Sequence, residues 1–561
     1  MRGFVMVFVV LLFNGKGFSQ NETSKNSIIN VKEYKALGDG KTDDTKAIQS
    51  CISMAQVGDT VYIPEGKYLV KALGLKSGVH IRAEGLLIQN FAGEREEFSP
   101  SKQNSSAPLF RGINVSDVSL TFNAQSVHEA IYLSGSKKVM IYDSQIRGDS
   151  NTLKSFAGIL LYDCEGISIK NTTISHYGAG RVSPDTYQPG TAIRILSSKN
   201  ISVTHNQILN NGENGIFMHD TPDVEVSHNR ILNNGMSAIQ VAFGVNGIEK
   251  NYRFINNLME DNAADAIDIN NRSPREFLDI NCLIEKNTSR NNGFVKGEST
   301  PDGSGIATLI NVSGVRMVDN LAEGNNRPAL YVESCGDIYA KGNMADNQVE
   351  VVLKFNELIL HDNTFSIISL LSNVDGKKLL LSHNKLHSLS LPNGIRVDSL
   401  LLENNLISNA KLNFNMEGNV RMCDNTINSH DGDGAILVVR VNSMHIENNR
   451  IISTKSQAVG IRKMAQHVTI INNDIKSVNT CILDDGSKGL EIRDNKLMSL
   501  KGGRFRHTLV SRNPDGLILS DNEHISAKKF NSLRLEGPGT ARVSSEIILK
   551  GYADYGSVQV K

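Results

Sequence analysis

The sequence predicts an all-β solenoid in which the chain winds through many parallel coils, and three observations indicate this fold class. An asparagine returns at nearly constant spacing, because Asn363, Asn384, Asn405 and Asn425 are 21, 21 and 20 residues apart. Short runs of alternating aliphatic and polar residues flank each of them, as in strands with one buried face. No i, i+3, i+4 stripe recurs, which argues against a helical or leucine-rich repeat. The series continues at Asn206, Asn229, Asn257, Asn287, Asn320, Asn343, Asn449, Asn473, Asn495 and Asn522.

One repeat, residues 192–214, shows how such a coil is built. Ile193 and Ile195 open a first alternating run, and Ile201 and Val203 form a second one. Coils stacked about 4.8 Å apart would pair every strand with the strands above and below it. Asparagine at a tight corner can adopt left-handed backbone angles and hydrogen-bond along the stack. We therefore expect the asparagines to mark the corners and the aliphatic side chains to fill the interior.

Composition fits one long solenoid and does not favour nucleic acid or a membrane as a partner. The 561 residues are 40% hydrophobic and contain no Trp, and Lys+Arg equals Asp+Glu at 59 each. This balance gives no global indication of nucleic acid or of a membrane surface as a partner. We expect a monomer.

The first 20 residues are typical of a secretory signal peptide. Arg2 precedes an apolar run from Phe4 to Phe13 that is too short to span a membrane as a helix. We therefore expect a secreted or periplasmic protein. The predicted organisation is a signal peptide at 1–20, an N-terminal cap with the first coils at 21–90, a parallel β-helix at 91–525 and a C-terminal strand cap at 526–561.

The cysteines are expected to be buried thiols. They are scattered along distant coils, with no CxxC motif, so they cannot reach disulfide geometry. No pair of Cys or His residues has the spacing of zinc ligands, and we expect no metal site of this kind. The six are Cys51, Cys164, Cys282, Cys335, Cys423 and Cys481.

A short amphipathic helix is predicted before the coils. Within residues 45–55, Ile48, Cys51, Ile52 and Ala55 share one helical face. Such a helix would cover the open end of the solenoid, where exposed strands would otherwise aggregate.

The same segment carries a family resemblance. Residues 38–45 (GDGKTDDT), 47–49 (AIQ) and 61–68 (VYIPEGKY) resemble the entrance motif of the pectate-lyase-like superfamily of right-handed parallel β-helix proteins. Polygalacturonase-type hydrolases, polysaccharide lyases, uronan C5-epimerases and phage tailspikes share this motif, which is specific for fold and nearly silent on chemistry. We read Asp43 and Asp44 as turn and cap residues. The resemblance implies a right-handed β-helix with its substrate along the outside of one parallel sheet.

That outer surface can be written out from the sequence. Coils align on the small-aliphatic pair that begins each first strand, and the following residues alternate between outside and inside. A bland scaffold would place Ser, Thr, Asn and Lys outside, whereas these columns collect aromatic, charged and amide side chains. The first outward column is Leu160, Arg194, Phe217, Gln240, Asp268, Ala307 and Tyr331, and the second is Tyr162, Leu196, His219, Ala242, Asn270, Leu309 and Glu333.

Long insertions occur beside these columns. The asparagine spacing grows to 28, 30 and 33 residues between Asn229 and Asn320. Loops that depart from a regular scaffold are where binding and catalysis usually lie. We expect residues 176–190 and 293–305 to form walls beside the sheet.

Two chemistries fit the columns. Arg194 with His219 and Tyr162 would suit β-elimination or epimerisation of a uronic acid, since the cation neutralises the carboxylate and His or Tyr moves the proton. Asp268 with Asp265 or Asp220 would suit glycoside hydrolysis, which needs paired carboxylates. Each candidate also has a purely structural interpretation, a surface histidine or a corner aspartate. Substrate contacts are expected from Phe217, Gln240, Asn270, Tyr331 and Glu333.

The resemblance does not reach a subfamily. The chain lacks the Asn-Thr-Asp, Gly-His-Gly and Arg-Ile-Lys signatures of pectin-type hydrolases, and Ser183-Pro184-Asp185-Thr186 has no His where epimerases carry Asp-Pro-His. We expect a secreted lyase or C5-epimerase acting on a uronate-containing polysaccharide. A glycoside hydrolase and a non-catalytic glycan-binding or adhesion β-helix remain alternatives. No cofactor is demanded, although the acidic residues would permit Ca²⁺.

Overall fold

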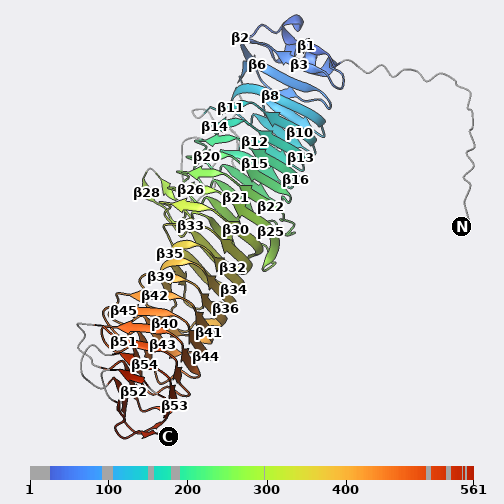
Figure 1. Ribbon diagram of the computed structural model, residues 1–561. Coiled ribbons are helices and arrows are strands. Elements are labelled where there is room, and N and C mark those ends of the chain that lie inside the picture. Colours follow the sequence, from blue (N-terminus) through green and yellow to red (C-terminus); the bar gives the residue numbers. More distant parts are fainter. Residues whose placement is uncertain are drawn as a thin grey trace, which may run out of the picture.

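The computed structural model describes residues 26–90, 105, 107–149, 157–178, 190–295, 297–500, 507–525, 532–545, 547–549 and 553–560. Over these residues the chain forms one elongated solenoid of parallel strands (Figure 1). The predicted all-β parallel helix is confirmed. The predicted signal peptide lies outside the described residues. None of the described helices is long and apolar enough to cross a membrane.

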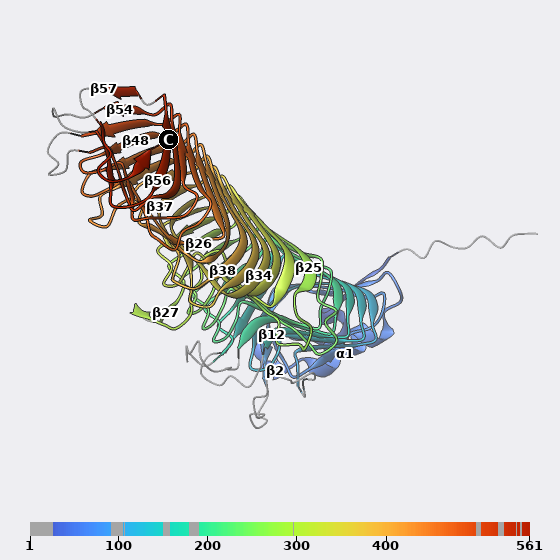
Figure 2. The same cartoon turned by 90° about the horizontal axis from the view of Figure 1, so that it is seen from below.

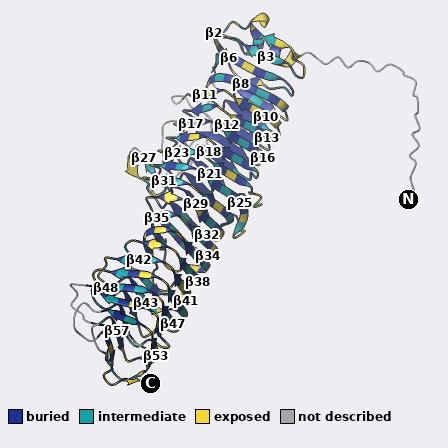
Figure 3. Cartoon of the chain, in the orientation of Figure 1, coloured by how far each residue is buried: buried dark blue, intermediate teal, exposed yellow. Residues whose placement is uncertain are grey.

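A typical coil contributes three strands, each paired in parallel with its counterpart in the next coil. The interior side chains are largely aliphatic, as the alternation predicts, and they form one continuous core. Buried residues recur along the whole solenoid (Figure 3). In one coil the strands are β15 (Thr191–Leu196), β16 (Lys199–Thr204) and β17 (Gln207–Leu209), which pair with β18 (Ile216–His219), β19 (Val224–Ser227) and β20 (Arg230–Leu232).

The first strands of successive coils form the sheet that concerns function. Besides β15 and β18, this sheet includes β9 (Ile131–Ser134), β12 (Ala157–Tyr162), β21 (Ile239–Ala242), β24 (Ile267–Asn270), β29 (Ala307–Ile310), β32 (Leu330–Lys341) and β34 (Val349–His361). Neighbouring strands of this series pair in parallel, including β29 with β32 and β32 with β34.

The recurring asparagines form a continuous buried ladder. The backbone N–H and the side-chain amide of Asn206 both donate to Oδ1 of Asn229, at 2.8 and 3.0 Å, and the same pair of bonds recurs as far as Asn495 and Asn522. The left-handed backbone angles, however, belong to the residue before each ladder asparagine, such as His205 or Asn404. The ladder is confirmed, and the expectation that its asparagines adopt left-handed angles is wrong. Their amides are fully engaged by the stack, while the preceding residue turns the corner.

A second, shorter ladder follows the first by five residues. Asn211 donates to Asn234, and the series continues through Asn262 and Asn292 to Asn325. The second ladder includes the coils with long insertions, and the insertion at 293–305 begins directly after its member Asn292. A double ladder therefore holds the part of the solenoid whose coils vary most in length.

The N-terminal end is capped by a helix, as predicted. Helix α1 (Thr45–Met54) lies at that end of the solenoid (Figure 2) and buries Ile48, Cys51 and Ile52. The Asp44 carboxylate accepts from the backbone N–H groups of Leu37 and Gly38, at 2.7 and 3.0 Å. Asp43 accepts from the Thr45 N–H. Both aspartates therefore have the contacts of turn residues.

Toward the C-terminus the described chain continues the parallel pairing. β55 (Leu533–Glu536) pairs with β52 (Leu509–Arg512), and β56 (Thr540–Ser544) pairs with β53 (Asp515–Ser520). Residues 526–531, where the predicted C-terminal cap begins, lie outside the described residues. All six cysteines are buried and free, as expected.

Candidate functional site

The register of the first sheet reproduces the outward columns with one exception. Arg194, Phe217, Gln240 and Asp268 follow one another in register, as predicted. The next partner of Asp268 is Thr308. Ala307 and Leu309, which were expected outside, are wholly buried in the core, so their placement is wrong. The sequence alignment was one residue early because Ile306 takes the place that Ala266 has in the coil before.

The C-terminal part of these columns, from Gln240 onward, lines a cleft of about 440 Å³. Six of the ten candidate site residues line it, namely Gln240, Asp265, Asp268, Asn270, Tyr331 and Glu333. It spans the outer face of β21, β24, β29 and β32 and the loop that precedes β29. The other lining residues are Met236, Ser237, Ala264, Arg272, Pro301, Asp302, Ser304, Thr308, Ile310, Arg327, Pro328 and Glu350.

The other four candidates lie on the coils before the cleft. Arg194 is fully buried, and its Nη1 lies 3.3 Å from Oε1 of Glu213, which is also fully buried. The guanidinium lies 4.5 Å from the centre of the Phe217 ring. Phe217 is itself buried in a small apolar cluster with Tyr132, Ala157, Leu160 and Leu196, against which Tyr162 packs. Arg194 and Phe217 were expected on an exposed surface, and here their side chains serve packing and charge pairing.

His219 lies at the end of β18 and keeps 40% of its side chain exposed. Its Nδ1 is 3.4 Å from Oδ2 of Asp220. In the register it stands between Leu196 and Ala242. The structure therefore does not bring His219 together with the carboxylates of the cleft.

Asp268 is a buried carboxyl group on the outer face of β24. Its Oδ2 accepts from the Gln240 amide at 2.8 Å, and the Gln240 oxygen accepts from Asn214 at 2.9 Å, which fixes the orientation of the amide. Oδ1 of Asp268 is buried and has no hydrogen-bond partner among the described residues. Burial, followed by the negative charge of Asp265, raises the pKa of Asp268 to about 8. Both effects favour the protonated form of the carboxyl group.

Asp265 precedes the same strand and has different partners. Its Oδ1 accepts from the backbone N–H groups of Gly303 and Ser304, at 3.0 and 2.6 Å. Burial raises the pKa of Asp265, while these two donors oppose the rise because they stabilise the anion. Asp265 thus has the contacts of a corner residue and also lines the cleft beside Asp268.

A second hydrogen-bonded pair lies on the next coils. The Tyr331 hydroxyl donates to Oε2 of Glu333 at 2.6 Å. Burial and this bond to Glu333 raise the pKa of Tyr331. On the following strand, Glu350 accepts from the Gln348 amide at 3.0 Å. The far side of the cleft therefore presents a phenol and two carboxylates.

The predicted wall at 293–305 forms part of the cleft. Its outer portion is a short antiparallel hairpin of β27 (Phe294–Val295) and β28 (Glu298–Ser299) that stands out from the solenoid (Figure 2), and its return carries Pro301, Asp302 and Ser304 into the lining. Of the other predicted wall, residues 179–189 lie outside the described residues.

Sequence reasoning missed several lining residues. Arg272 and Arg327 were not considered because they follow and precede strands rather than occupying the columns. Thr308 was hidden by the alignment error. Glu350 is in register with Tyr331 and would have been found by extending the column by one coil. The two arginines supply the cationic groups that the sequence analysis had sought in Arg194.

Comparisons with known proteins agree with this architecture. Residues 103–277 match the family described as right handed beta helix region, and residues 28–86 match the family described as rhamnogalacturonase A/epimerase, pectate lyase-like. Together with the coil geometry, they identify the chain as a right-handed β-helix protein. The match of residues 28–86 confirms the resemblance to the pectate-lyase-like superfamily seen in residues 38–68.

Among curated relatives, mannuronan C5-epimerase AlgE1 of Azotobacter vinelandii is 31% identical over 124 residues, which are 20% of this chain and 9% of the relative. Alginate lyase 7 of the same organism is 36% identical over 107 residues, 17% of this chain and 12% of the relative. Plasmin and fibronectin-binding protein A of Streptococcus pneumoniae is 27% identical over 208 residues, 33% of this chain and 24% of the relative. The matches thus span less than a quarter of each relative's length and leave the subfamily open.

Among solved structures, the family 28 exopolygalacturonase of Yersinia enterocolitica has a TM-score of 0.30 and 13% identity, with coverage of 84% of this chain and 78% of that chain.

Proposed function

We propose that this chain is a carbohydrate-active enzyme that hydrolyses glycosidic bonds in the cleft between β21 and β34. The observation that carries the proposal is the buried pair of Asp268 and Asp265 in an accessible cleft. Glycoside hydrolysis uses two carboxyl groups, of which one holds a proton for the leaving oxygen and the other is ionised.

The surroundings of the two groups divide these roles. The pKa of Asp268 near 8 keeps a proton on it at neutral pH, and Oδ1, which has no partner among the described residues, is free to donate that proton. Burial raises the pKa of Asp265 as well, but Asp265 accepts two backbone N–H bonds, which favour its charged form. In the proposed mechanism Asp268 is the general acid, and Asp265 is the carboxylate that activates water or attacks the sugar.

The substrate contacts follow from the same cleft. Asn270 and Tyr331 offer hydrogen bonds and an aromatic face to a sugar ring, and Glu333 orients the Tyr331 hydroxyl. Arg272 and Arg327 would meet the carboxylates of a uronate-containing polysaccharide. An acidic glycan therefore remains the proposed substrate class.

Elimination or C5-epimerisation is a second candidate function. It is favoured by Tyr331 in one cleft with Arg272 and Arg327, since such chemistry needs a cation for the carboxylate and a group that moves the adjacent proton. The epimerase and lyase relatives add support. For this second function, Tyr331, Arg272 and Arg327 would take the roles first expected of Arg194, His219 and Tyr162. A non-catalytic adhesin, as the pneumococcal relative suggests, would bind glycan without changing it.

Export through residues 1–20, action as a monomer and assistance by Ca²⁺ are further proposals. Carboxylates at Asp302, Glu333 and Glu350 offer the oxygen ligands that Ca²⁺ prefers. Loss of activity in EDTA and its return with Ca²⁺ would support a calcium role, and unchanged activity would reject it.

The test is to incubate the chain from Asn21 to Lys561 with acidic and neutral polysaccharides while following reducing ends and the ultraviolet absorbance of unsaturated uronate. Reducing ends alone are expected for hydrolysis. A parallel rise of both signals would establish the lyase and overturn the hydrolase. Neither signal, with a changed NMR spectrum of the polymer, would establish epimerisation.

A further inference from the structure

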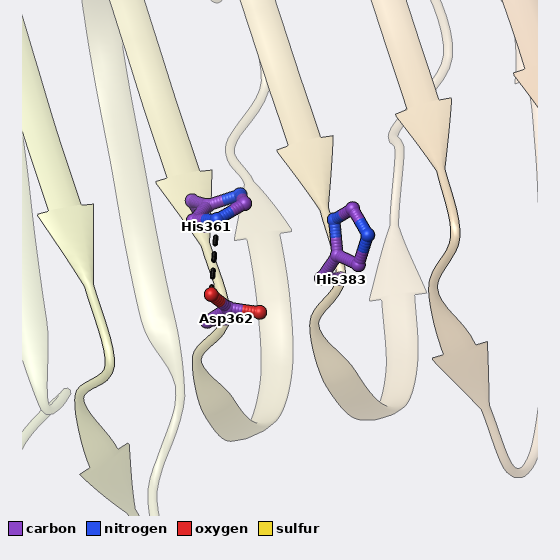
Figure 4. Close-up of side chains that lie close together, drawn as sticks. All are labelled: His361, Asp362 and His383. Atoms are coloured by element: carbon purple, nitrogen blue, oxygen red, sulfur yellow. Dashed lines mark ion pairs between the residues drawn. The ribbon is translucent and has the colours of Figure 1, made fainter.

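A second group of chemically active side chains lies outside the cleft, at a corner of two later coils. His361 ends β34, Asp362 follows it, and His383 follows β36 (Asp375–Ser382) (Figure 4). Within the part of the chain that the structure describes, this is the one group of three His, Cys, Asp or Glu side chains whose ligand atoms all lie within 4.8 Å of one another. No residue of this group lines the cleft.

The side chains already face one another. Nε2 of His361 lies 2.9 Å from Oδ2 of Asp362, and the rings of His361 and His383 are 5.2 Å apart in an edge-to-face arrangement. Nδ1 of His383 lies 2.8 Å from the Ser382 hydroxyl. Histidines that bind metals usually hydrogen-bond through their second ring nitrogen, which fixes the ring. Ser382 occupies Nδ1 in this way and leaves Nε2 of His383 for an ion.

The backbone holds these ligands in place. Asp362 and His383 occupy the same left-handed corner position of successive coils, with φ of 54° and 58°. Each is followed by a ladder asparagine, and the N–H of Asn363 donates to Oδ1 of Asn384 at 2.9 Å. His361 is in register with Ser382. The three ligands therefore stand on two coils that the ladder fixes relative to each other, which is the rigid support a metal site needs.

We propose that His361, Asp362 and His383 bind one divalent transition-metal ion of the Zn²⁺ type, with the remaining coordination positions open to solvent. Two imidazoles and a carboxylate suit Zn²⁺, Ni²⁺ or Cu²⁺, whereas Ca²⁺ and Mg²⁺ prefer oxygen ligands alone. The ligand atoms lie within 4.8 Å of one another, so bonds of about 2.0–2.2 Å to a common ion would draw them closer together. The sequence concealed this site because its ligands are separated by one coil period instead of a local motif.

The test is calorimetric titration of the tag-free full chain with Zn²⁺, repeated with Co²⁺ while its visible absorption is followed. One ion per chain is expected. His361→Ala and His383→Ala should each weaken binding by more than the roughly 10- to 100-fold that loss of an outer-shell partner costs. His383→Gln, which keeps the size of the side chain, should bind as weakly as His383→Ala. All variants should retain the thermal unfolding midpoint of the metal-free chain, since His383 is exposed and His361 is only half-buried.

The matched control is the pair His205 and His228. It lies on successive coils in the same kind of left-handed corner, but its rings stack in parallel at 4.8 Å, and the partner of His228 is the Asn256 amide. The double variant His205→Ala/His228→Ala should bind Zn²⁺ as the unaltered chain does. The proposal is overturned if the unaltered chain binds no ion, if His361→Ala with His383→Ala leaves the affinity unchanged, or if only the control variant loses binding.

Discussion

The coils that carry the cleft and the regular coils that follow share one asparagine ladder but differ in the length of the coil and in the burial of their charged groups. Between Asn229 and Asn320 the ladder residues are 28, 30 and 33 residues apart, whereas from Asn343 to Asn425 they are 20 or 21 apart. The ladder bonds are the same in both, at 2.9 Å from Asn257 N to Asn287 and 2.9 Å from Asn384 N to Asn405.

This comparison shows how a solenoid accommodates a site. Insertions enter at another corner of the coil and leave the ladder undisturbed, because each ladder bond depends only on the neighbouring coil. The inserted loop at 293–305 can therefore wall the cleft without altering the stacking beneath it. The cleft gathers buried ionisable groups, whereas the regular coils from Asn343 to Asn425 carry exposed ion pairs such as Arg396 with Asp398.

The largest difference in activity between variants of the two regions is expected at Asp268. Asp268→Asn removes the proposed general acid and should lower kcat by about 100- to 10,000-fold, measured on the polysaccharide that the chain cleaves. Asp375→Asn, on the exposed surface of a regular coil, is the matched control and should leave kcat unchanged. Equal activity of both variants would contradict a catalytic role for Asp268 and for the cleft.

A large effect on stability is expected at the buried pair of Arg194 and Glu213. Either Arg194→Met or Glu213→Gln leaves one uncompensated polar or charged group in the interior and should lower the free energy of unfolding by about 3–5 kcal/mol. Urea denaturation measures this loss. If Arg194→Met unfolds at the same urea concentration as the unaltered chain but abolishes activity, Arg194 is a catalytic residue after all.

A smaller effect, equal in the two regions, is expected from the ladder. Asn257→Ala in the cleft coils and Asn405→Ala in the regular coils should each cost about 1–3 kcal/mol, because each leaves buried backbone groups unsatisfied. Thermal unfolding and the activity of both variants should be compared. A much larger loss of unfolding free energy for Asn257→Ala would show that the coils with insertions depend more strongly on the ladder.

The last effect concerns how stability depends on pH. Asp268 binds its proton more tightly in the folded chain, so its stabilising contribution is present at low pH and is lost as pH rises through about 8. Each unit of pKa shift amounts to about 1.4 kcal/mol, so even part of the shift is measurable. The unaltered chain should lose more stability than Asp268→Asn between about pH 5 and pH 9 in urea denaturation. Parallel losses in both would mean that Asp268 is ionised throughout.

Most of the fold could be predicted from the sequence, because strand alternation, the asparagine period and the capping helix are local patterns. The site could be predicted only in part. Asp268, Gln240 and Tyr331 were found because they occupy the outward columns. The sequence could not reveal that Arg194 is buried and paired with Glu213. The alternation shows only whether a residue faces inward or outward, and not which other residues cover it. The sequence also could not give the correct register at Thr308. The small-aliphatic pair that marks the start of each first strand lies one residue earlier in this coil.

The most direct test of the central claim, that catalysis lies in the cleft and not on the preceding coils, is to compare Asp268→Asn with His219→Ala in the same reducing-end assay. The account predicts that Asp268→Asn is nearly inactive while His219→Ala retains most of its activity. An inactive His219→Ala beside a fully active Asp268→Asn would contradict it and return the site to the coils around Arg194.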